Sequence, residues 1–161
     1  MKFHEHIIRV TVPGLPCEVT REELSGELAD FAHRPEHFLE EVTKSEVVSP
    51  ERRGSEPGSI AFERNIYFGH LVFHETVQIG ADGSYRSHAA GSGERPASDF
   101  SMQIEEPEPG QLFIRFIYFE DRPDRSTICV VLLMRAKTRA LWRRCLPILL
   151  SAKWRLRTDY C

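Results

Sequence analysis

Hydrophobic and polar positions follow two spacings along the chain. Residues 6–12 are rich in β-branched side chains and predict a first strand. From Lys44 to Asp121, apolar and polar residues alternate with a period of two, which indicates strands that bury one face. Glycine- and proline-rich turns separate these segments, so we expect an antiparallel sheet of hairpins. The predicted later strands are 44–52, 59–68, 71–79, 84–90, 99–106 and 112–121.

Between the first strand and the others, the spacing is that of helices. Thr20 and Glu23 match a capping box. Apolar residues follow at i, i+4 and i+7, so the sequence predicts a helix over 21–32. Pro35 is favourable at the start of a second short helix. The apolar side of that helix would be Phe38, Leu39 and Val42.

The last forty residues predict one long helix. Arg135, Arg139 and Arg143 stand at i, i+4 and i+8, which is a row on a helix surface, and we expect a helix over about 126–146. Pro147 must end or kink it. These elements predict an α+β fold over residues 1–161 as one domain. We expect an arrangement in which a curved seven-stranded antiparallel sheet wraps around the long C-terminal helix and two short helices follow the first strand.

Composition agrees with a globular protein. Of 161 residues, 41% are hydrophobic and 28% are charged, which excludes a disordered chain or a disulfide scaffold. No apolar run is long enough to span a membrane, and no secretory signal is recognisable. The four cysteines form no C-x-x-C pair, so we expect a reduced, cytoplasmic protein.

Charge is distributed unevenly. Residues 1–121 hold 11 Lys/Arg against 22 Asp/Glu, a net charge of −11, whereas residues 122–161 hold 10 against 2, a net charge of +8. We expect the basic segment to dock on the acidic body rather than to bind nucleic acid, because no aromatic residues are interleaved along its arginine row. Contact with nucleic acid or anionic lipid is the alternative.

The dipeptide Gly69-His70 fixes the register of one hairpin. It suits a two-residue turn with glycine first, which makes Phe68 face Leu71. The other opposed residues on that face are then Ile66–Phe73, Arg64–Glu75, Phe62–Val77 and Ile60–Ile79. This apolar, inward face therefore holds one ion pair. A slip of one residue would move it to solvent.

The pair Arg64–Glu75 has two interpretations. The two groups satisfy each other, or they orient the carbonyl, phenol or carboxylate of a ligand. A buried pair adds little net stability, so a purely stabilising role is unconvincing, and both interpretations stay open. The remaining side chains expected to line a ligand cavity are Phe62, Ile66, Phe68, Phe73, Phe100, Met102, Phe116 and Tyr118. The sequence shows no convincing metal-ligand spacing and no convincing nucleotide-binding motif. We therefore expect no metal, no cofactor and no set of catalytic residues.

Four segments resemble the AtaL-like subfamily, a domain of unknown function within the helix-grip superfamily. They are FHEHIIRV at 3–10, VTREEL at 19–24, RPEHFLEEVTKSEV at 34–47 and IEEPEPGQLFIRFIYFE at 104–120. The superfamily, also called SRPBCC, includes START domains, polyketide cyclase-like proteins and the birch-pollen-allergen-like proteins. The resemblance implies the helix-grip fold and a pocket for a hydrophobic ligand. It offers no settled catalytic residues.

These observations favour a binder of a small apolar or aromatic molecule, held between the sheet and the C-terminal helix. One alternative is a cyclase- or dehydratase-like enzyme, with Glu75 as acid/base and Arg64 holding an enolate-like oxygen. Another is an interaction protein with a filled cavity. The sequence does not identify the ligand or the oligomeric state.

Overall fold

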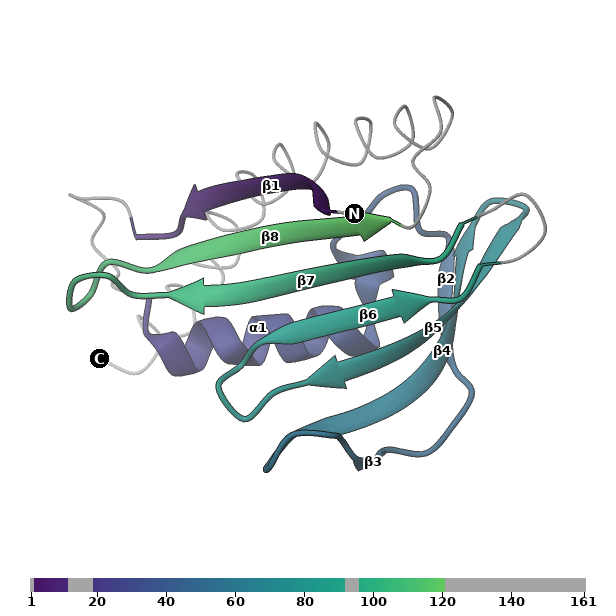
Figure 1. Ribbon diagram of the computed structural model, residues 1–161, viewed down its shortest axis with the longest axis horizontal. Coiled ribbons are helices and arrows are strands. Elements are labelled where there is room, and N and C mark those ends of the chain that lie inside the picture. The colour runs from purple at the N-terminus through teal and green to yellow at the C-terminus, as the bar shows by residue number, and fades with distance from the viewer. Residues whose placement is uncertain (1, 12–18, 92–95, 121–161) are drawn as a thin grey trace, which may run out of the picture.

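A curved antiparallel sheet with one helix on its inner face forms the body of the protein (Figure 1). The computed structural model describes residues 2–11, 19–91 and 96–120. In these residues the order along the sheet is β1-β8-β7-β6-β5-β4-β2, with β3 also paired to β4. The strands are β1 Lys2–Arg9, β2 Lys44–Val47, β3 Arg52–Arg53, β4 Ile60–Phe68, β5 Leu71–Ile79, β6 Tyr85–Ala89, β7 Ser98–Glu105 and β8 Phe113–Glu120.

The prediction of seven strands is wrong, because the described residues form eight. The segment expected as one strand over 44–52 is divided into β2 and β3, and both pair with β4. Pro50 lies between them and has no N–H to give to a ladder. The backbone N–H groups of Val48 and Ser49 instead both point to the carbonyl of Glu63, so the chain bends away between the two short strands.

The helix α1, Arg21–His33, confirms the prediction for 21–32. Its capping box is complete: Glu23 N donates to Thr20 Oγ1 at 3.1 Å, and Thr20 N donates to Glu23 Oε2 at 3.1 Å. The second predicted helix is reduced to one 3₁₀ turn, η1 Pro35–His37. Residues 38–43 must already bring the chain to β2, which pairs with β4 from Lys44 onward, so no room remains for a longer helix.

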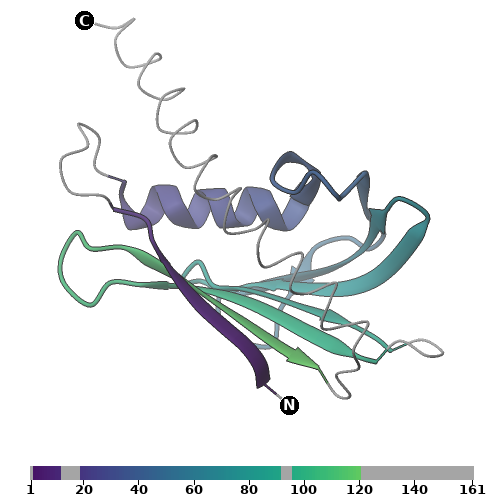
Figure 2. The ribbon, with the colours of Figure 1, turned by 90° about the horizontal axis from the view of Figure 1, so that it is seen from above.

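The core lies between α1 and the inner face of the sheet, which curves toward the helix (Figure 2). Leu24, Leu28 and Phe31 are the buried face of α1, as their spacing predicts. The ring of Phe31 packs edge-on against Tyr85 on β6 and Phe38 after η1. The main buried sheet residues of this core are Ile8, Val10, Phe62, Val77, Ile79, Tyr85, Met102, Ile104, Leu112, Ile114, Phe116 and Tyr118.

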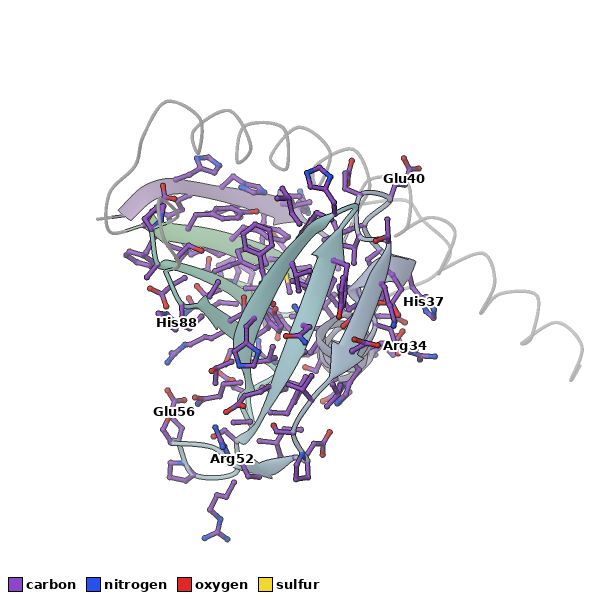
Figure 3. The ribbon with its side chains drawn as sticks, turned by 90° about the vertical axis from the view of Figure 1, so that its right-hand side faces the viewer. Arg34, His37, Glu40, Arg52, Glu56 and His88 are labelled. Atoms are coloured by element: carbon purple, nitrogen blue, oxygen red, sulfur yellow. The ribbon has the colours of Figure 1, made fainter. Side chains whose placement is uncertain are left out.

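The other face of the sheet carries exposed polar side chains together with exposed apolar ones, among them Ile7, Val72 and Phe119. The labelled side chains of Arg52, Glu56 and His88 point away from the interior in Figure 3, and all three are exposed. Arg34 and His37, next to the end of α1, are exposed as well. No helix in the described part of the chain is both long and apolar enough to cross a membrane. The helix predicted over 126–146 and the arginine-rich segment 122–161 lie outside the described residues.

Gly83 brings the β5–β6 turn into direct contact with α1. It has a φ of 80°, and a Cβ placed there would stand 2.7 Å from Ser25 Cβ and also clash with Ser25 Oγ. Both the backbone conformation and the close approach therefore require glycine. Gly69, in the β4–β5 turn, has a φ of 61° and nothing within 4 Å of such a Cβ.

This contrast gives a matched pair of variants. We expect Gly83→Ala to lower the free energy of unfolding by about 2–4 kcal/mol, because backbone strain and overpacking against α1 add. Gly69→Ala should cost only the backbone term, about 1–2 kcal/mol. Urea denaturation of both variants measures the difference. Equal losses would show that Ser25 does not press on the turn.

Candidate functional site

The predicted register of the β4–β5 hairpin is confirmed. The Cα partners run from Phe68↔Leu71 at the turn to Ile60↔Ile79 at the far end, and Arg64 stands opposite Glu75. The positive φ of Gly69 supplies the conformation that a two-residue turn with glycine first requires. Because side chains alternate across a strand, this register places Arg64 and Glu75 on the inner face.

Arg64 and Glu75 form the ion pair that the register predicts. Arg64 Nε and Nη2 both donate to Glu75 Oε2, at 3.0 and 2.8 Å. The Arg64 side chain is 2% exposed and that of Glu75 is 15% exposed. The charge of Arg64 is thus fully removed from water, whereas the carboxylate keeps an open edge.

The same guanidinium also holds the end of α1. Nη1 donates to the carbonyl of Ala32 and, at 3.5 Å, to that of Phe31, two residues of the last helical turn. Carbonyls at a helix C-terminus lack intrahelical partners and carry partial negative charge, so a cation there is favourable. Burial opposes the charge, but the pKa of Arg64 is still raised, because the oxygen of Tyr85 and the carboxylate of Glu75 outweigh it.

Tyr85 completes the set of Arg64 partners. Its hydroxyl oxygen accepts from Arg64 Nη2 at 2.7 Å. The ring is buried between Phe31 of α1 and Phe100 of β7, with centroid distances of 5.4 and 5.8 Å. Burial raises the pKa of Tyr85 to about 12. The sequence pattern placed Tyr85 on a strand but gave no sign of this contact, which joins residues 21 positions apart.

The predicted lining residues divide into two groups on the inner face. Phe62 and Met102 are completely buried in the core, where the Phe62 ring stacks on His33 of α1 at 4.8 Å. Ile66, Phe116 and Tyr118 are also buried. The remaining three, Phe68, Phe73 and Phe100, face inward by register and are only half-buried.

Aromatic rings on the inner face stack on one another across three strands, β7, β8 and β1. Phe100 on β7 stacks on Tyr118 of β8 at 4.7 Å. His6 on β1 stacks on Phe116 of β8 at 4.6 Å, and His4 lies 5.1 Å from His6. We call these five residues the aromatic wall. The two histidines were not predicted as lining residues, although the alternation His4, His6, Ile8, Val10 was a signal for their inward direction.

A row of small side chains lies next to the aromatic wall. Cross-strand pairing connects Glu75 to Ala89, Ala89 to Ser98 and Ser98 to Glu120. These four residues, the Glu75–Glu120 row, share the inner face, and its two middle members are the small ones. Glu75 therefore borders two positions of the inner face whose own side chains are small.

The described residues contain no cluster of three or more His, Cys, Asp or Glu side chains that could hold a metal ion. The site consists instead of an ion pair with one accessible carboxylate, the aromatic wall and the row of small side chains between them. Such a combination can hold a flat apolar molecule and orient it through one polar group.

Comparison with known proteins agrees with this architecture. A family model described as AtaL, Acetylaranotin biosynthesis cluster protein L, matches residues 8–128. The chain belongs to the AtaL family. Among solved structures, it is similar to a START superfamily protein from Mycobacterium smegmatis, with 11% identity and a TM-score of 0.53, over 89% of this chain and 97% of that one. At that identity the likeness shows the fold alone. No curated protein matches the chain.

Because of the buried ion pair in this AtaL-family protein, we expect the loss of the Glu75 carboxylate to destabilise the fold more than the loss of the Glu63 carboxylate. Glu75→Ala leaves a buried cation short of its carboxylate, and we expect a loss of about 3 kcal/mol in unfolding free energy. Glu63→Ala is the control: Glu63 is next to Arg64 on β4, faces outward and accepts from Arg52 at 3.1 Å in an exposed pair. Its loss should cost less than about 1 kcal/mol. Similar values for the two variants in urea denaturation would mean that Arg64 is solvated.

Tyr85 predicts a loss of stability in alkali. The tyrosine ionises near its ordinary pKa of 10.0 in the unfolded chain but only near 12 in the folded protein, so the folded state binds more protons in between. The free energy of unfolding should fall by up to about 1.4 kcal/mol per pH unit across that interval. Urea denaturation as a function of pH measures this slope. Tyr85→Phe should flatten it, and an unchanged slope would place its origin elsewhere.

Proposed function

We propose that this protein binds a small hydrophobic or aromatic molecule on the inner face of its sheet, beyond the part covered by α1. The observation that carries the proposal is the partial exposure of Phe68, Phe73 and Phe100, whose side chains face inward. An apolar ligand that covers such rings removes their surface from water, which contributes about 25 cal/mol of binding free energy for each Å² covered.

The arrangement of the site supports a flat ligand. Three rings of the aromatic wall, those of His4, His6 and Phe100, are half-buried, and we expect a second ring system to stack on them, since aromatic pairs prefer such offset contacts. The Glu75–Glu120 row has small side chains at its two middle positions, Ala89 and Ser98, and we propose that the ligand lies over them. The polar group at the edge is the Arg64–Glu75 pair, which is the polar handle of the proposed site. The remaining predicted lining residues, Phe62, Ile66 and Met102, are buried on the same face as Phe116 and Tyr118.

The fold adds an independent argument. The START superfamily neighbour and the AtaL family model together make a helix-grip domain the frame of the molecule, and the curved sheet of this fold suits ligand binding. We extend the proposal to a single helix-grip domain over 1–161 that acts in the cytoplasm as a binder rather than an enzyme.

An uncharged fluorescent dye tests the proposal. We expect N-phenyl-1-naphthylamine to bind saturably with micromolar affinity, about −8 kcal/mol, and to brighten as it leaves water. Ser98→Phe places a ring on the Glu75–Glu120 row and should weaken binding at least about tenfold, which is about 1.4 kcal/mol. Ser101→Phe is the matched control, because Ser101 lies on the same strand and faces outward, opposite Arg86 and Ile117. It should bind the dye as the parent does.

Circular dichroism spectra of both variants establish that they are folded. No saturable binding by the parent, or equal weakening in the two serine variants, would reject the inner face as the binding site. Native mass spectrometry of the protein purified from its own host, in search of a retained small molecule, identifies the physiological ligand directly.

A further inference from the structure

We propose that the ligand of this site presents a hydrogen-bond donor, such as a phenol or an aromatic N–H, and that carboxylate ligands are rejected. This inference rests on the proposed function and names its ligand class. It follows from the hydrogen bonding of the Arg64–Glu75 pair. The N–H groups of Arg64 all contact acceptors within the protein, whereas the carboxylate of Glu75 is accessible to a ligand.

The guanidinium of Arg64 has no donor left for a ligand. Arginine carries five N–H groups, and those of Arg64 have five acceptor contacts inside the protein. Two go to Glu75 Oε2, one to Tyr85 Oη and two to the last carbonyls of α1. A ligand carboxylate could reach this cation only by displacing Glu75 or by pulling α1 away from the sheet. Either exchange gives up contacts that already satisfy a buried charge.

Glu75, in contrast, keeps a hydrogen-bond acceptor that no described residue uses. Both bonds from Arg64 reach the same atom, Oε2. The other oxygen, Oε1, accepts no hydrogen bond from any described residue, and the side chain keeps 15% of its surface exposed. A carboxylate oxygen is only an acceptor when ionised. The polar atom that meets a ligand at this place is therefore an acceptor with negative charge.

The position of Glu75 relative to the rings determines what reaches it. Its cross-strand neighbour on β6 is Ala89, whose methyl group is short, and its neighbours two residues along the strand are Phe73 and Val77. A ring system that lies over Ala89 and Ser98 against the aromatic wall has one edge directed at Glu75. A hydroxyl or N–H on that edge donates to Oε1, whereas a carboxylate there meets a like charge in a site with little water.

Three probes with the same naphthalene ring system distinguish a preference for a hydrogen-bond donor from apolar binding alone. Naphthalene has no polar group, 2-naphthol has a donor, and 2-naphthoate is ionised at neutral pH. We expect 2-naphthol to bind the full-length protein at least about tenfold more tightly than naphthalene, because hydrogen bonds to charged groups are strong. We expect 2-naphthoate to bind most weakly. Probe fluorescence and calorimetry at neutral pH give the three dissociation constants.

Two variants assign the preference to Glu75. Glu75→Gln removes the charge, so the advantage of 2-naphthol over naphthalene should shrink to less than about threefold, and 2-naphthoate should bind more tightly than to the parent. Glu63→Gln makes the same change on the outer face of the neighbouring strand and should keep the parental ranking. If Glu75→Gln does not fold, the ranking of the three probes on the parent protein still decides.

The outcomes separate the inference from the proposed function. Saturable binding of naphthalene with 2-naphthoate preferred over 2-naphthol would overturn the donor rule and leave the proposed function intact. The same holds if the three probes bind alike. Absence of saturable binding for all three probes would overturn both. A ranking of 2-naphthol, naphthalene and 2-naphthoate that collapses only in Glu75→Gln supports the inference.

Discussion

The buried guanidinium of Arg64 connects the end of α1 to three strands of the sheet through hydrogen bonds. It lies on β4, next to the edge strand β2. Its partners are carbonyls in the last turn of α1, a carboxylate on β5 and a hydroxyl on β6. A buried charge is tolerated only where its hydrogen bonds are satisfied. The position of α1 over the sheet, the inward direction of Glu75 and the burial of Tyr85 therefore depend on one another. Removal of any one leaves a charge or a polar atom without compensation.

The sequence allowed the centre of this site to be predicted but not its full set of partners. A glycine-first turn and strict alternation on both sides fixed one hairpin register, and from that register the facing of Arg64, Glu75 and the nearby phenylalanines followed. Register is predictable here because a slip of one residue exchanges every inward and outward side chain. The family assignment was also correct, since the AtaL model covers residues 8–128.

What could not be predicted depends on contacts between distant residues. The acceptors on α1 are backbone carbonyls, which leave no trace in residue identity, and they lie about thirty positions before Arg64. The second short helix was overestimated because Phe38 and Val42 are buried as an apolar pattern predicts, but in turns rather than in a helix. The stacking of His6 on Phe116 was not predicted either, because it joins the first strand of the chain to the last.

The order of the strands has a consequence for how the chain folds. β2 to β8 are joined by hairpins or short connections, so most of the sheet is able to form soon after each segment leaves the ribosome. β1 is different: the first strand in the chain pairs with the last, and His6 meets Phe116. Closing so long a loop is slow and adds to the contact order of the fold. β1 must therefore wait, unpaired, until β8 is synthesised. The end of the sheet that carries the aromatic wall is therefore the last part of the sheet to assemble.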